Sequence, residues 1–146
     1  MSDSVTIRPA NELDLDAIIA IDEKLSGQYR PDIWERRLTY YLRRDPDSSV
    51  VAEADGELLG FMLGEVRSGE FGQEEATGWI EVVGVDPDHR GRSVGRELAS
   101  AMLDHFRRRG AAKVRTFVDA EREDLSAFFA SLGFQPATLR PLVMAL

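Results

Sequence analysis

The sequence predicts a single α/β (α+β) domain in which four helices flank a mixed sheet of about six to seven strands. Short apolar runs of strand length alternate along the chain with longer segments whose apolar residues recur at helical spacing. The chain has 146 residues, 43% of them hydrophobic, with no internal repeat and no linker-like stretch. A chain of this size buries roughly 70% of its unfolded surface as one unit. We therefore expect residues 1–146 to form one domain.

The N-terminal third is expected to form a strand and two helices. Residues Val5–Arg8 are strand-like, and Asn11 is placed to cap a helix that ends at Gly27. Pro31 suits the first turn of a second helix, which should end before Pro46.

A hairpin should follow these helices. Ser49–Ala54 and Leu58–Val66 are apolar runs, and the Asp55-Gly56 pair between them is a strong signal for a tight turn between antiparallel strands. The polar stretch 67–77 then predicts a surface loop.

The rest of the chain is expected to alternate strands and helices. Trp79–Val85 and Lys113–Val118 are the predicted strands, and the segment between them carries apolar residues every four positions and ends near Gly110. A last amphipathic helix should stop at Gly133, and Leu139–Leu146 should close the sheet as an edge strand.

Composition excludes several functions. There is no cysteine, so a disulfide framework, a thiolate metal site and a cysteine nucleophile are all excluded. The net charge of −8 argues against nucleic acid and suits a cationic partner. No run approaches the about 18 apolar residues of a membrane span, so we expect a cytoplasmic protein. Neither His89 nor His105 has a second ligand at metal spacing, and we expect no metal.

The segment from Gly78 to Gly95 carries the main functional signal. It is a strand, a turn and the loop RGRSVG, which opens directly onto a helix. Backbone N–H groups at a helix N-terminus bind phosphate, although a loop of this composition is also often only a solvated helix start. A phosphate-bearing ligand is the leading hypothesis.

Two motifs resemble the GCN5-related N-acetyltransferase (GNAT) superfamily. The first is V-x-V-D-P-x-x-R-G-R-x-V-G-R-x-L, within Ile80–Leu98, and the second is the run ending in F-F-A-S-L-G-F, within Ala127–Phe134. The resemblance covers nearly the whole chain in element order. It implies a fourth strand that splays from the fifth, with the pantetheine arm of acetyl-coenzyme A (acetyl-CoA) in the gap.

The resemblance also implies which residues bind the cofactor. Strand backbone should bond the pantetheine amides, and the loop should hold the pyrophosphate. The family has a glycine where this chain has Ser93, which limits the approach of the backbone. Gly84 should either assist a strand bulge or simply pack closely. The implied cofactor contacts are Val83, Gly84, Val85, Arg90, Gly91, Arg92, Ser93, Val94, Gly95, Arg96 and Phe129.

Glu81 is the candidate catalytic residue, because some relatives carry a glutamate there that acts as general base. The alternative is that Glu81 faces solvent or pairs with Arg67 or Arg115. Relatives commonly have a tyrosine acid at the position of Phe129, so the thiolate would have to leave unaided. Phe128 and Phe129 could both pack against the pantetheine, although their helical spacing also fits a helix core.

The resemblance implies acetyl transfer from acetyl-CoA to a primary amine: a protein N-terminus, a lysine or a small cationic amine. The amine would attack directly in a ternary complex. The rival hypotheses are a coenzyme A-binding sensory or regulatory module with weak or no turnover, and a binder of another nucleotide phosphate. An exposed terminal strand would also allow a homodimer.

Overall fold

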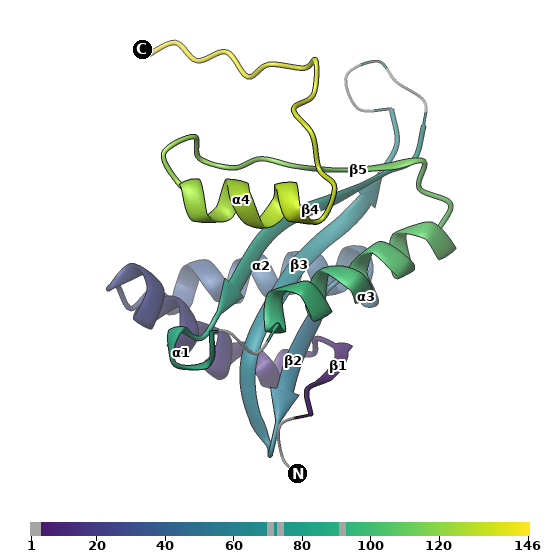
Figure 1. The fold of residues 1–146 in the computed structure, drawn as a ribbon. Coiled ribbons are helices and arrows are strands. Elements are labelled where there is room, and N and C mark those ends of the chain that lie inside the picture. Colours follow the sequence, from purple (N-terminus) through teal and green to yellow (C-terminus); the bar gives the residue numbers. More distant parts are fainter. Residues whose placement is uncertain (1–3, 70–71, 73–74, 91–92) are drawn as a thin grey trace.

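The computed structural model describes residues 4–69, 72, 75–90 and 93–146, and its centre is a twisted sheet between helices (Figure 1). In the described chain the sheet has five strands, each beside the next in chain order. The pairs β1–β2, β2–β3 and β3–β4 are antiparallel and the pair β4–β5 is parallel, so the predicted mixed sheet is confirmed. The strands are β1 (Thr6–Pro9), β2 (Val50–Ala54), β3 (Glu57–Arg67), β4 (Thr77–Val85) and β5 (Lys113–Thr116).

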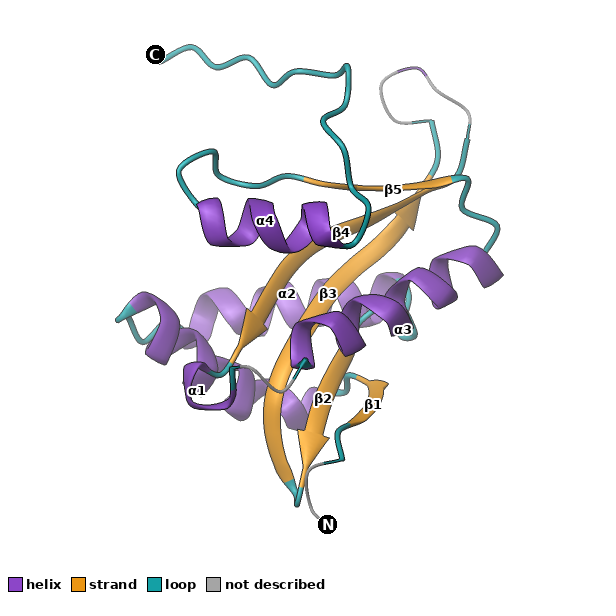
Figure 2. Ribbon diagram, viewed as in Figure 1, coloured by secondary structure: helices purple, strands orange, loops and turns teal. Residues whose placement is uncertain are grey.

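Within the described residues, four α-helices cover the two faces of the sheet (Figure 2). α1 (Leu15–Ser26) and α2 (Pro31–Arg44) bury their apolar sides against one face. α3 (Val94–Arg108) and α4 (Glu123–Ser131) pack against the other. In the part of the chain that the structure describes, no helix has the length and apolar character needed to cross a membrane.

The local signals of the N-terminal half are confirmed. The side chain of Asn11 accepts a hydrogen bond within the short 3-10 helix that leads into α1, and Gly27 ends α1 in the left-handed conformation. Pro31 is the first residue of α2. Asp55 and Gly56 both have positive φ, at 53° and 76°, as the tight turn between β2 and β3 requires.

The predicted C-terminal edge strand is wrong. Residues 139–146 are not in a strand, so the sheet ends at β5 and has five strands instead of six to seven. Pro141 cannot donate to a ladder, and the segment runs away from β5 (Figure 1). Its apolar side chains are therefore exposed, with Leu142 at 90% and Val143 at 99%.

Candidate functional site

The site begins where β5 stops following β4. The two strands pair only from Thr77 opposite Lys113 to Ile80 opposite Thr116. The hydroxyl of Thr116 donates to the carbonyl of Ile80 at 2.8 Å and ends the ladder. Beyond it, residues 81–85 of β4 have no strand on their outer side within the described chain. This open edge presents unpaired backbone groups, which must bond to water or to a ligand.

A cavity of about 440 Å³ lies along the open edge. Its walls come from the end of β4, the N-terminus of α3, the start of α4 and the last turn of α1. The predicted gap beside the fourth strand is thus present as a cavity in the described chain. It is lined by Leu25, Val83, Gly84, Val85, Arg90, Ser93, Val94, Gly95, Arg96, Arg122, Asp124, Leu125 and Phe128.

Both charge and the helix N-terminus favour an anion in this cavity. Arg90, Arg96 and Arg122 all line it. Arg122 is already paired with Asp124 at 3.1 Å, and Arg96 donates to the hydroxyl of Ser131 in α4 at 3.2 Å. The N-terminus of α3, with its positive end of the helix dipole, lies at the same wall.

Ser93 and Gly95 shape the start of α3. Ser93 has φ = +60°, in the left-handed region that glycine adopts most easily. The backbone conformation therefore explains why a glycine suits this position. A Cβ on Gly95 would lie 3.1 Å from the ring of Phe128, so this glycine lets α4 approach α3 closely.

A β-bulge on β4 lies at Glu81, and not at Gly84 where the sequence suggested it. Leu63 is opposite Val82 but Gly64 is opposite Ile80, which leaves Glu81 as the extra residue. Gly84 therefore makes no bulge. Its alternative role as a close-packed glycine holds, because a Cβ there would lie 2.6 Å from the ring of Phe61.

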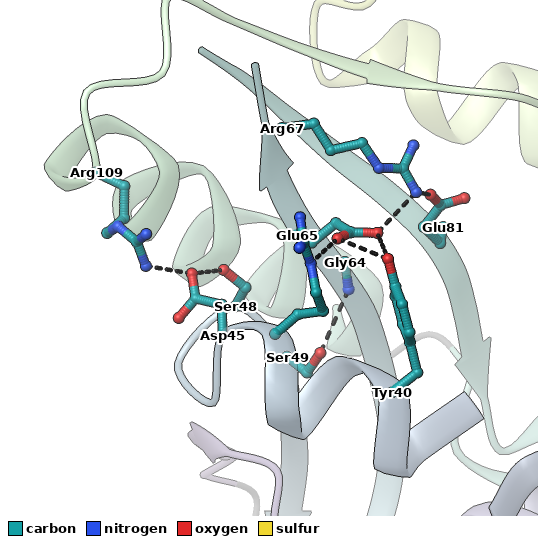
Figure 3. Close-up of polar contacts among 10 residues, drawn as sticks. Tyr40, Asp45, Ser48, Ser49, Gly64, Glu65, Arg67, Glu81 and Arg109 are labelled. Carbon is teal, nitrogen blue, oxygen red and sulfur yellow. Dashed lines mark hydrogen bonds and ion pairs between the residues drawn. The ribbon is translucent and has the colours of Figure 1, made fainter. Parts of the chain in front are cut away.

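Glu81 is held in a polar cluster on the sheet face that α2 covers (Figure 3). Its carboxylate pairs with Arg67, which was one of the partners considered from the sequence. Arg67 also contacts Glu65 at 2.7 Å, and Glu65 is only 1% exposed. Burial alone would raise the pKa of Glu65, but hydrogen bonds from Arg67, Tyr40 and Arg44 outweigh it and lower that pKa.

The structure brings most of the expected cofactor residues together. Val83, Gly84, Val85, Arg90, Ser93, Val94, Gly95 and Arg96 all line the cavity. Gly91 and Arg92 lie outside the described residues.

Phe129 is placed differently from the expectation. It does not line this cavity and is 4% exposed in the core, where its ring packs against Phe134. Its neighbour Phe128 lines the cavity instead.

Sequence reasoning missed several lining residues. Leu125 is one of them, and the spacing that predicts an apolar face for the last helix places it beside Phe128, which was expected to pack against the pantetheine or in the core. No local signal marks Leu25 or Arg122, because α1 and the turn before α4 reach the cavity only through the tertiary fold.

A second carboxylate cluster lies between the α2–β2 turn and the C-terminal end of α3 (Figure 3). Asp45 accepts a hydrogen bond from Ser48 at 2.5 Å, lies 3.2 Å from the ring nitrogen of His105, and pairs with Arg109. Burial opposes ionisation of Asp45, yet the hydrogen bonds from Ser48 and His105 prevail and lower its pKa. The cluster ties the α2–β2 turn to α3.

One group of side chains has the composition of a cation site. Within the described residues, ligand atoms of Glu57, Asp86 and His89 lie within 4.8 Å of one another. Both oxygens of Asp86 accept hydrogen bonds from Lys24, at 3.0 and 3.2 Å, so its charge is already balanced. We therefore assign no metal to this group.

Comparisons with known proteins agree with this geometry. A family model described as "Acetyltransferase (GNAT) family" matches residues 15–134. A mycothiol acetyltransferase from Thermobispora bispora is 39% identical over 90 residues, which are 62% of this chain and only 30% of that relative.

Two solved structures share the fold over nearly their whole length. The aminoglycoside N-acetyltransferase AAC(6')-Iy, determined in complex with CoA, has a TM-score of 0.84 at 20% identity, covering 97% of this chain and 95% of its own. A transcriptional regulator from Bacillus halodurans has a TM-score of 0.80 at 24% identity, covering 98% of this chain and 100% of its own.

Proposed function

The chain belongs to the acetyltransferase (GNAT) family, and we propose that it is an acetyl-CoA-dependent N-acetyltransferase acting on a primary amine. The observation that carries the proposal is the position of the cavity. It follows the unpaired edge of β4 to the positive N-terminus of α3, and Glu81 begins the same unpaired segment. An extended ligand with an anionic end fits such a site.

The residues of the cavity suit acetyl-CoA, which supplies the activated acetyl group as a thioester. We assign the amides of its pantetheine arm to the backbone of Val83 and Val85, one of whose N–H groups would face the thioester oxygen. An N–H aimed at the developing oxyanion is worth about 2.7 to 4 kcal/mol in acyl transfer. Arg90 and Arg96 would hold the pyrophosphate, and Phe128 takes the packing role expected of Phe129.

Glu81 is the proposed general base. An alkyl ammonium has a pKa of about 10.4, so a proton must leave before the nitrogen can attack. Glu81, with 24% of its side chain exposed, would accept that proton through a water molecule. The neutral amine then attacks the thioester carbonyl, the new C–N bond forms, and the C–S bond breaks. The nitrogen loses its second proton, and the departing thiolate takes up a proton through solvent to give the free thiol. Because a thiol has a pKa of about 8.5, the thiolate can leave without an acid.

The proposed acceptor is a cationic amine: a small molecule, a protein N-terminus or a lysine. The net charge of −8 favours such a partner. The structural neighbour AAC(6')-Iy is named an aminoglycoside N-acetyltransferase, so the acceptor of that protein carries an amine. We place the reaction in the cytoplasm, as expected from the sequence.

A thermal-shift panel with acetyl-CoA, longer acyl-CoA species, ATP and NAD tests binding first. A ligand at a hundred times its Kd stabilises a protein by about 2.7 kcal/mol. We expect a shift with acetyl-CoA that ATP and NAD do not match. No response to any CoA species would overturn the proposal, and a preference for ATP or NAD would favour another nucleotide ligand.

Turnover is tested by thiol release across amine and peptide acceptors. The second candidate function, a CoA-binding regulatory module, is favoured by the Arg67–Glu81 ion pair and by a phenylalanine at position 129. The Bacillus halodurans neighbour is itself named a transcriptional regulator. Binding of acetyl-CoA without thiol release for any acceptor would identify the chain as such a module.

We also propose that the chain forms a homodimer through its C-terminal segment. Leu142, Val143 and Met144 are exposed, and β5 has no strand on its outer side within the described chain. An apolar groove of about 530 Å³ lies between β5, α4 and residues 134–141. The segment of one copy would extend the sheet of the other at β5.

Light scattering after gel filtration tests the dimer. The wild-type chain is expected at twice its monomer mass and the double variant Leu142→Asp, Val143→Asp at one. A wild-type chain that is monomeric across micromolar concentrations would contradict the proposal.

A further inference from the structure

Glu65 is a carboxylate that the proposed reaction does not use. It is 1% exposed on β3, and both of its oxygens are engaged. The hydroxyl of Tyr40 lies 2.9 and 3.0 Å from the two oxygens, Arg44 donates to Oε1 at 2.9 Å, and Arg67 donates to Oε2 at 2.7 Å. Its position is therefore fixed from two elements, α2 and β3.

Arg67 joins this fixed carboxylate to the proposed base (Figure 3). The same nitrogen, Nη2, contacts Oε2 of Glu65 and Oε1 of Glu81. The guanidinium also lies over the ring of Trp79, 5.1 Å from its centroid. Glu65 and Trp79 thus orient Arg67, and Arg67 in turn contacts Glu81 through its Oε1.

Stability alone does not account for this arrangement. A buried ion pair contributes little net stability compared with apolar groups of similar size, because its charges lose their hydration. Here Arg67 connects the buried carboxylate of Glu65 to Glu81, the residue at the bulge of β4. From that residue onward the strand has no partner on its outer side within the described chain. A carboxylate on a bulge has fewer backbone restraints than one in a regular ladder, so an external support matters more at Glu81.

We propose that Arg67, anchored by Glu65, is a positioning residue that holds the carboxylate of Glu81 toward the acceptor amine. The inference rests on the proposed function, since it gives Glu81 a reaction to serve. Arg67 does not touch the cavity assigned to acetyl-CoA. Loss of Arg67 should therefore change turnover and leave cofactor binding intact.

The experiment compares kcat and KM of the variants by thiol release. We expect Arg67→Gln to lower kcat by roughly tenfold to a hundredfold, the usual cost of misplacing a catalytic group by about 1 Å. The KM for acetyl-CoA and the thermal shift that it causes should stay unchanged. Arg67→Lys, which keeps the charge, should recover part of kcat.

Arg44→Gln is the matched control. Arg44 bonds to the same Glu65 at 2.9 Å, but it does not contact Glu81. Tyr40 and Arg67 still hold Glu65 in this variant, so its kcat should fall far less than that of Arg67→Gln. An equal loss in Arg44→Gln and Arg67→Gln would show a general effect through Glu65 and overturn the inference.

A double variant separates positioning from an independent role. In a Glu81→Gln background, Arg67→Gln should cause no further loss of kcat, because the group that it positions is gone. A full additional loss would contradict positioning, as would an unchanged kcat in Arg67→Gln alone.

Failure of the proposed function is recognised separately. A wild-type chain without thiol release overturns both claims. A wild-type chain that turns over, with an Arg67→Gln variant of equal kcat, overturns only the positioning role. If Arg67→Gln does not fold, Arg67→Lys is measured in its place. A wild-type kcat in Arg67→Lys, or a full additional loss of kcat when Arg67→Lys is combined with Glu81→Gln, would contradict positioning.

Discussion

The two halves of β4 differ in their strand pairing, their burial and their relation to the cavity. Residues 77–80 pair with β3 on one side and with β5 on the other, and all four are buried. Residues 81–85 pair with β3 alone, and residues 83–85 line the cavity. The first half is a scaffold strand, and the second forms a wall of the proposed binding site.

The difference shows that a candidate binding site can form where a neighbouring strand ends, without any additional helix or strand. The bulge at Glu81 lies where the two halves meet. Because successive residues of a regular strand alternate between faces, one extra residue changes the face on which later side chains lie. Val82 consequently packs with the α1 and α2 core, and Val83 with the α3 core.

The largest expected effect is that of Glu81→Gln, which removes the proposed base from the open half. We expect kcat to fall about 10²- to 10⁴-fold, the usual contribution of general base catalysis, with the acetyl-CoA thermal shift retained. Glu53→Gln is the control, because Glu53 is also a strand carboxylate paired with an arginine, Arg8. Equal thiol-release rates for Glu81→Gln and the wild type would remove Glu81 from the mechanism.

Gly78 lies in the paired half of β4 and Gly84 in the open half, so variants of these two residues allow a direct comparison. A Cβ would lie 2.5 Å from the ring of Phe106 at Gly78 and 2.6 Å from the ring of Phe61 at Gly84. Each change to alanine should lower the free energy of unfolding by about 1–3 kcal/mol through overpacking, measured in urea. Only Gly84→Ala should also reduce the acetyl-CoA thermal shift. An equal reduction in Gly78→Ala would mean that the paired half shapes the site as well.

Acid should destabilise the protein through two buried carboxylates, Glu65 opposite Trp79 in the paired half and Asp45 near the C-terminal end of α3. Each has a pKa lowered in the folded state. Their contribution to stability is present above the ordinary carboxyl pKa and is lost as the pH falls through the lowered value. Unfolding in urea at stepped pH should show this loss.

Asp45→Asn and Glu65→Gln serve as the comparison for that titration. Each should lose less stability on acidification than the wild type, because one titrating group is gone. An unchanged pH dependence in both variants would show that other carboxyls govern acid unfolding.

The smallest expected effect is a gain at the entrance to α3. Ser93 has a positive φ, which costs a residue with a Cβ about 1 kcal/mol relative to glycine. Ser93→Gly should therefore raise the free energy of unfolding by up to about 1 kcal/mol. Ser100→Gly, an exposed site within α3, should instead lower it. A loss of stability in Ser93→Gly would show that the serine is specifically stabilising.

Local chemistry made much of the fold predictable. A capping residue at Asn11, a helix stop at Gly27 and the Asp55-Gly56 turn each act over a few residues, and all three are confirmed. Most of the residues expected to bind the cofactor lie near one another between Val83 and Arg96, and they line one cavity together. Their contact with acetyl-CoA stays a prediction.

Predictions that depended on distant partners did less well. The strand expected at Leu139–Leu146 would have to pair with the free outer edge of β5, and in the described chain it does not. The choice between Phe128 and Phe129 depends on how α4 is rotated against α3, which the pattern of one helix does not fix.

The sequence by itself determined the order of the elements up to α4 and the loop that opens α3, because these follow from residues near one another along the chain. The candidate base came from the resemblance of its motifs to the GNAT superfamily. Only the tertiary structure decided that the bulge falls at Glu81 and that Glu65 and Arg67 hold it. The register between β3 and β4 and the packing of α2 set those contacts. Both are long-range, and neither leaves a signal in any one segment.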